Sequence, residues 1–139
     1  MKCVEITGAK ELKVTTKDEP AKSDNKVTFK VNACGICGSD IHYWDMGAPA
    51  GLVMGHEFSG TVTDPGDRKD LKVGDRITGL PISPCGKCDA CRSGNPQYCQ
   101  ETWTHAIGLS LENSGGYAEY SSCYSSMVRK LPDTVTDVE

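Results

Sequence analysis

The stretch CGKCDACRSGNPQYC, residues 85–99, holds four of the eight cysteines of this 139-residue chain. Its spacing is C-x2-C-x2-C-x7-C, and the glycines and prolines within it and before it favour tight turns. Tetrahedral zinc takes four thiolates at about 2.3 Å, and short C-x2-C steps let turns aim two sulfurs at one point. Four protein ligands leave no position for a substrate. The stretch therefore predicts a structural zinc that staples a lobe at about residues 84–100, with the ligands Cys85, Cys88, Cys91 and Cys99.

Two other uses of clustered cysteines are less compatible with this sequence. A bacterial ferredoxin has the spacing C-x2-C-x2-C-x3-C-P, whereas here the last cysteine comes seven residues on and is followed by Gln100. Disulfides belong to exported proteins, and the start MKCVEITGAKELK lacks the apolar core of a signal peptide. Reduced thiols in a cytoplasmic protein are therefore expected.

The composition is that of one soluble globular domain. Hydrophobic residues make up 37% and charged residues 24% of the chain. The net charge of −4 gives no electrostatic reason for a nucleic-acid partner. No run approaches the roughly 18 apolar residues of a membrane span, so no membrane partner is expected.

Short alternating segments predict a mainly β fold. In residues 27–33 the apolar side chains alternate with polar ones. Residues 57–63, 76–80, 117–121 and 127–131 read as further strands, and turn signals separate them. Many short strands with long loops favour a barrel or a sandwich. Thr136 and Glu139 match a capping box that opens a helix, and the chain stops there, which suggests that a longer protein continues beyond it.

A second constellation combines cysteine, histidine and carboxylate. CGICGSDIHYW covers residues 34–44, and Gly55-His56-Glu57 follows about twenty residues after the serine. A catalytic zinc uses such ligands from separate segments and keeps one position open. Cys34-x2-Cys37 alone fits two small buried residues or a redox pair, and His56 alone fits a core histidine. Their joint occurrence favours a metal site.

These motifs resemble a known family. The segments CGICGSDIH, GHEFSGTV, VGDRI, PCGKCDACRSGNPQYC and GGYAEY occur in the order found in zinc-dependent medium-chain alcohol and polyol dehydrogenases. The similarity spans most of the chain and is to the N-terminal catalytic domain of these enzymes, which has a GroES-like β-barrel fold with short helices. CGSDIHYW resembles the sorbitol, butanediol and threonine dehydrogenase branches.

The resemblance implies roles for particular residues. Cys37 and His56 match ligands of the catalytic zinc. Glu57 matches a glutamate that binds this zinc in polyol-type members and lies behind the ligands in others. Ser39 matches the hydroxyl that contacts the substrate alcohol, and His42 matches the histidine that ends the proton relay.

The remaining cysteines have no role in the family. These are Cys3, Cys34 and Cys123, and we expect them to be buried and inert. His105 and the segment around it read either as an exposed loop or as a segment that approaches a substrate or a neighbouring subunit.

The resemblance also implies a function. It predicts oxidation of a secondary alcohol, a polyol or diol, to a ketone by hydride transfer, with one structural zinc, one catalytic zinc and NAD or NADP. No G-x-G-x-x-G fingerprint occurs in residues 1–139. We therefore expect the Rossmann cofactor domain to lie outside this chain, the chain alone to be inactive, and the full-length protein to be a homo-oligomer.

The alternative is a non-catalytic, zinc-stabilised GroES-like interaction module. Such a module has no need for the catalytic-type set, which comprises Cys37, Ser39, His42, His56 and Glu57.

Overall fold

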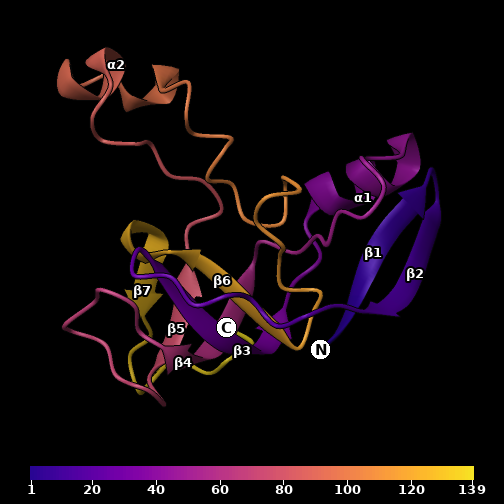
Figure 1. The fold of residues 1–139 in the computed structure, drawn as a ribbon, viewed down its shortest axis with the longest axis horizontal. Coiled ribbons are helices and arrows are strands. Elements are labelled where there is room, and N and C mark those ends of the chain that lie inside the picture. Colours follow the sequence, from indigo (N-terminus) through magenta and orange to yellow (C-terminus); the bar gives the residue numbers. More distant parts are fainter.

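The computed structural model describes residues 1–139 as two antiparallel sheets, two α-helices and two 3-10 turns (Figure 1). A hairpin pairs β1 (Lys2–Gly8) with β2 (Glu11–Thr16). The larger sheet has the order β6-β3-β4-β5-β7. Its strands are β3 (Lys26–Cys34), β4 (Phe58–Asp64), β5 (Arg76–Gly79), β6 (Tyr120–Tyr124) and β7 (Val128–Lys130). The helical elements are α1 (Gly38–Met46), α2 (Asp89–Arg92), η1 (Pro96–Tyr98) and η2 (Ser125–Met127).

The predicted mainly β class is confirmed, with two differences in the strands. β6 begins at Tyr120 rather than at residue 117, because residues 117–119 bond instead to neighbouring backbone: Tyr117 N–H donates to Met54 O, and Glu119 N–H donates to Lys2 O. The β1–β2 hairpin was not predicted. It packs one face of β1 on a small second core, where Ile6 contacts Leu52 and Met54.

The large sheet is strongly curled. β6 and β7 lie at its opposite edges, yet only the three residues of η2 join them. Neighbouring strands are about 4.8 Å apart, so the edges of a flat five-stranded sheet would lie roughly 19 Å from each other. The four Cα steps from Tyr124 to Val128 reach at most about 14 Å. The sheet must therefore bend toward a barrel, although no ladder joins β6 to β7.

The main core lies inside this curl. Val27 and Phe29 of β3 are fully buried, as the alternating pattern predicted. The Phe29 ring stacks on Phe58 with centroids 4.7 Å apart. A Cβ on Gly60 would lie 2.5 Å from the Phe29 ring, so the strand needs glycine there.

The lobe that carries the four cysteines is an excursion between β5 and β6. α2 and η1 contact each other and stand away from the sheet (Figure 1). The chain leaves and returns at one point, since Ile107 N–H donates to Pro81 O at 3.1 Å.

The last residues form turns rather than a helix. Thr136 N–H donates to the Glu139 carboxylate at 2.9 Å, which is the glutamate half of a capping box. The segment is tied to the sheet because Ser59 Oγ donates to Asp137 O at 2.7 Å. None of the helices combines the length and the apolar composition needed to cross a bilayer.

Candidate metal centre and active site

Helix α1 begins directly after Cys37, and the third helical residue caps it. The Cys37 N–H donates to Asp40 Oδ2 at 2.9 Å, and the Cys37 side chain faces the first-turn backbone in return. This reciprocal arrangement satisfies groups that a helix N-terminus leaves unpaired. It also fixes the direction in which the thiol leaves the helix.

His56 and Glu57 reach the same place from the segment before β4. Gly55 precedes them with φ +94°, a region that favours glycine. A Cβ there would lie 2.7 Å from Cys34 Sγ and 2.8 Å from the Tyr117 ring. Gly35 N–H donates to Glu57 O at 2.7 Å, which joins the loop after β3 to this segment.

The structure brings Cys37, His56 and Glu57 together. One ligand atom from each lies within 4.8 Å of the others. His56 is buried, Cys37 is half-buried and Glu57 is exposed. The three residues line a cleft of about 880 Å³, and residues 135–139 line it as well. A thiol sulfur, an imidazole nitrogen and a carboxylate oxygen therefore meet in an open cleft.

Asp40 is the site residue that the sequence analysis missed. Its side chain is 2% exposed, and its Oδ1 lies 3.6 Å from His56 Nδ1. Neither atom has another partner. Metal-binding histidines usually donate their second ring N–H to a carboxylate. The available signal was an acidic residue three positions after Cys37, in the first turn of a short helix.

Ser39 lies at the cluster, whereas His42 lies apart from it. In the tautomer with the proton on Nδ1, His56 Nε2 accepts a hydrogen bond from Ser39 Oγ at 3.3 Å. His42 is exposed one turn further along α1 and makes no hydrogen bond to Ser39. A direct Ser39-to-His42 relay is therefore not formed, and a bridging hydroxyl or water is needed between them.

The four cysteines of the lobe form a second cluster. Their sulfurs all lie within 4.8 Å of one another, and Cys88 Sγ is 3.5 Å from Cys91 Sγ. The Cys85 N–H points to Cys99 Sγ, and the Cys88 N–H points to Cys85 Sγ, each at 3.3 Å. Backbone turns thus aim the sulfurs at one point.

The surroundings give the four lobe thiols different pKa values. Backbone N–H groups, that of Cys85 first, lower the pKa of Cys99 to about 6, and those of Lys87 and Cys88 lower the pKa of Cys85. Desolvation and the Cys88 thiol raise the pKa of Cys91 to about 12. Close thiols cannot all ionise without a cation, so this cluster suits a divalent metal that displaces the protons.

Of the three leftover cysteines, two are buried and one lines the same cleft as the three-ligand cluster. Cys3 and Cys123 are buried, and burial raises the pKa of Cys123 to about 12. Cys34 is only half-buried and lines the cleft, which differs from the expected burial, although desolvation raises its pKa to about 11. The His105 ring packs on Tyr124 with centroids 4.3 Å apart.

Residues 23–133 match the family model described as the alcohol dehydrogenase GroES-like domain. The chain belongs to this family. The expected resemblance to medium-chain alcohol and polyol dehydrogenases is thereby confirmed.

Curated relatives of this GroES-like domain include two dehydrogenases. The L-threonine 3-dehydrogenase of Marinomonas sp. is 33% identical over 131 residues, which cover 89% of this chain and 37% of that protein. The sorbitol dehydrogenase of Halalkalibacterium halodurans is 36% identical over 134 residues, covering 94% of this chain and 38% of that protein.

Solved structures also match. An alcohol dehydrogenase from Escherichia coli CFT073, complexed with the cofactor NADH, superposes with a TM-score of 0.84 at 32% identity. The match covers 99% of this chain and 40% of that one. The GroES-like domain therefore spans about two fifths of the length of the proteins that it matches.

Proposed function

We propose that this GroES-like domain forms the substrate and zinc site of an NAD(P)-dependent dehydrogenase that oxidises a polyol, a diol or a similar secondary alcohol to a ketone. The observation that carries the proposal is the grouping of Cys37, His56 and Glu57 at the edge of the 880 Å³ cleft. Its named relatives act as threonine and sorbitol dehydrogenases, which supports this substrate class.

The residues present fit a catalytic zinc. Thiolate, imidazole and carboxylate are the ligand types that zinc takes, and three protein ligands leave one position for an exchangeable group. The unpartnered His56 Nδ1 faces Asp40, so Nε2 is the nitrogen turned to the cluster. Cys37, His56 and Glu57 would therefore hold the ion on its buried side, with the cleft on the other.

The chain's own residues then handle the proton of the alcohol. A bound zinc supplies a Lewis acid that makes a hydroxyl more acidic, and a bound nicotinamide accepts the hydride. When Nε2 is no longer available as an acceptor, Ser39 Oγ is free to turn to the substrate hydroxyl, where it would accept the alcohol proton while donating its own proton to the bridging group. His42 is exposed on the same helix and passes protons to solvent across a bridging group.

The lobe is proposed to hold a structural zinc. In a tetrahedron with bonds of about 2.3 Å the sulfurs are about 3.8 Å apart, close to the 3.5 Å between Cys88 and Cys91. Four thiolates close the site, so it stabilises the lobe and takes no part in the reaction.

We further propose that the nicotinamide is held by a Rossmann domain outside residues 1–139, because the matched proteins are more than twice as long. A reducing cytoplasm would keep the clustered thiols available for metal. We also propose that the complete protein assembles as a homo-oligomer. Light scattering tests the assembly.

The metal proposal is tested by chelation and the activity by assay. Graded EDTA should release zinc from the three-ligand cluster before the four-thiolate lobe, and Cys37→Ala should remove the first phase alone. The complete protein should reduce NAD or NADP with sorbitol, xylitol, 2,3-butanediol or threonine, and Cys37→Ala should abolish turnover. Release of all zinc in one phase, or turnover that survives Cys37→Ala, contradicts the proposal.

A further inference from the structure

Tyr117, in the GGYAEY motif, lies against the segment that carries His56. Three successive N–H groups, from Gly115 to Tyr117, donate to carbonyls of residues 53–55 at 2.7–3.0 Å. A Cβ on Gly115 would lie 2.3 Å from two of those carbonyl oxygens, so only glycine allows this approach. The backbone therefore sets the Tyr117 ring at a fixed distance from the metal cluster.

The Tyr117 hydroxyl reaches the carboxylate behind His56. It donates to Asp40 Oδ2 at 2.9 Å, while its distance to Gly35 O is 3.2 Å. A phenol has one proton to donate, and a carboxylate is the stronger acceptor. The bond to Asp40 is therefore the dominant one.

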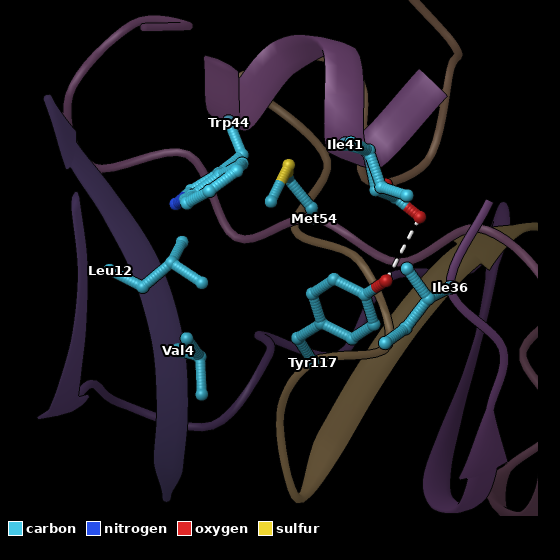
Figure 2. A pocket seen from close by; sticks show the side chains of 8 residues that line it. Val4, Leu12, Ile36, Ile41, Trp44, Met54 and Tyr117 are labelled. Carbon is cyan, nitrogen blue, oxygen red and sulfur yellow. Dashed lines mark hydrogen bonds between the residues drawn. The ribbon is translucent and has the colours of Figure 1, made fainter. Parts of the chain in front are cut away.

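The surroundings of this bond are apolar. Figure 2 shows the Tyr117 ring among Val4, Leu12, Met54, Ile36 and Ile41, with its hydroxyl on the dashed hydrogen bond. These side chains line a pocket of about 420 Å³. Burial and the Asp40 charge raise the pKa of Tyr117 above its usual range, so the phenol keeps its proton.

Two donors thus hold the same oxygen of Asp40. The Cys37 N–H and the Tyr117 hydroxyl both bond to Oδ2, each at 2.9 Å. Oδ1 is left without a donor and faces His56 Nδ1 at 3.6 Å. A shift of roughly half an ångström closes this contact to a hydrogen bond.

We propose that Tyr117 is a positioning residue for the metal centre: its hydroxyl holds Asp40 so that the free carboxylate oxygen receives the His56 Nδ1 proton and turns Nε2 to the metal. The inference rests on the proposed zinc site at Cys37, His56 and Glu57. It assigns to the tyrosine a role in metal affinity and in ligand geometry, with no contact to the substrate.

The test compares Tyr117→Phe with Tyr43→Phe. Both side chains pack against the small core around Ile6, and the Tyr43 hydroxyl makes no hydrogen bond. With zinc kept in the lobe, the three-ligand site is emptied by mild chelation and titrated with Co²⁺, followed by its visible absorption. Cys37→Ala identifies the signal of this site.

We expect Tyr117→Phe to bind Co²⁺ roughly 10- to 100-fold more weakly than the wild type, with unchanged stoichiometry and altered ligand-field bands. Tyr43→Phe should match the wild type in both. Equal affinity and spectra for Tyr117→Phe and the wild type overturn the role of the tyrosine and leave the metal site standing. Absence of any Cys37-dependent Co²⁺ signal in the wild type overturns the metal site itself.

A second variant changes the acceptor of the hydrogen bond between Tyr117 and Asp40. Asp40→Asn should also weaken Co²⁺ binding, and adding Tyr117→Phe to it should weaken binding by less than it does in the wild-type background. Additive losses would show that the hydroxyl acts independently of Asp40 and would overturn the proposal. The ring remains in Tyr117→Phe, and a near-ultraviolet circular dichroism spectrum verifies its packing.

Discussion

Asp40 lies in the first turn of helix α1 and also faces the proposed metal site. Its Oδ2 accepts the Cys37 N–H at the start of α1, and its Oδ1 faces His56. Ordering of the first turn of α1 and the proposed metal binding at Cys37 should therefore depend on the same carboxylate. Because metal binding free energy is partly folding free energy, we expect the α1 N-terminus to become more ordered when the cluster is loaded.

Ser39 and His42 lie on the same helix and should differ in their effects. Ser39→Ala removes the group that takes the alcohol proton, and turnover of the complete enzyme should fall roughly 100- to 10,000-fold. His42→Ala should lower turnover less and shift its pH profile, because solvent can partly replace an exposed residue. Both variants should retain zinc by elemental analysis. Loss of zinc in His42→Ala would contradict this separation.

At the scale of elements, β4 connects the core to the site. It begins one residue after Glu57, and it pairs with β3, which ends three residues before Cys37. The stacked rings of Phe29 and Phe58 lie across this pair. Packing of β3 on β4 therefore sets the separation of the two segments that carry Cys37 and His56.

Gly60→Ala tests how tightly this pair is packed. The added Cβ would lie 2.5 Å from the Phe29 ring and 2.8 Å from Lys30 O, so we expect destabilisation by about 1–3 kcal/mol. Gly38→Ala is the control, because a Cβ there meets nothing within 4 Å. Urea unfolding measures both. Equal stability of the two variants would mean that β3 and β4 can shift to accommodate the added methyl group, which contradicts the tight packing.

The loop between β4 and β5 is fastened by Arg68 in a pH-dependent way. Arg68 donates to both oxygens of Asp70 at 2.7 Å and to Ser125 O at 2.7 Å. Its guanidinium lowers the pKa of Asp70 from 3.8 to about 2. The stabilisation is thus complete above pH 4 and is lost as the pH falls toward 2.

Asp70→Asn should therefore be less stable than the wild type at pH 6, and the gap should close between pH 4 and pH 2. Thermal unfolding across this range measures it. Salt at about 1 M should shrink the gap at pH 6, because the Asp70 carboxylate is exposed. A gap that stays constant down to pH 2 would contradict the role of the ion pair.

For the whole molecule, we expect the lobe and the curled sheet to unfold separately. The four thiols gather on α2, η1 and the turns around them, and these elements do not pack on the sheet. With little core of its own, the lobe is expected to depend on the proposed zinc for its structure. The sheet instead has a buried core of ten residues.

Cys91→Ser should remove one zinc and unfold the lobe while the sheet persists. Hydrogen exchange should show lost protection in residues 85–99 and near-native protection in β3 and β4. Cys3→Ser changes a buried thiol away from the lobe and should keep both metals. If Cys91→Ser retains all its zinc with an unchanged melting temperature, the four-thiolate assignment is wrong.

Most of the correct predictions from the sequence came from residues that lie close together along the chain. The cysteine spacing and the Gly55-His56-Glu57 run are local, so the two residue clusters could be anticipated. Tyr117 is 77 residues from Asp40, and no periodicity links them. The β1–β2 hairpin was missed because Leu12 and Val14 stay exposed, and the apolar partners of β1 come from a distant loop. Cys34 reads as a small core residue, whereas the cleft reaches it.

The hydrogen bond between Pro81 and Ile107 closes the base of the lobe, so the lobe is an insertion whose length the sheet does not constrain. Both ends of the excursion meet at one backbone contact, 3.1 Å long, so residues between them can be added or removed without pulling on either strand. Closing such a loop costs entropy that grows only slowly with its length. Insertions or deletions between these two residues should therefore leave the strand register of the sheet unchanged.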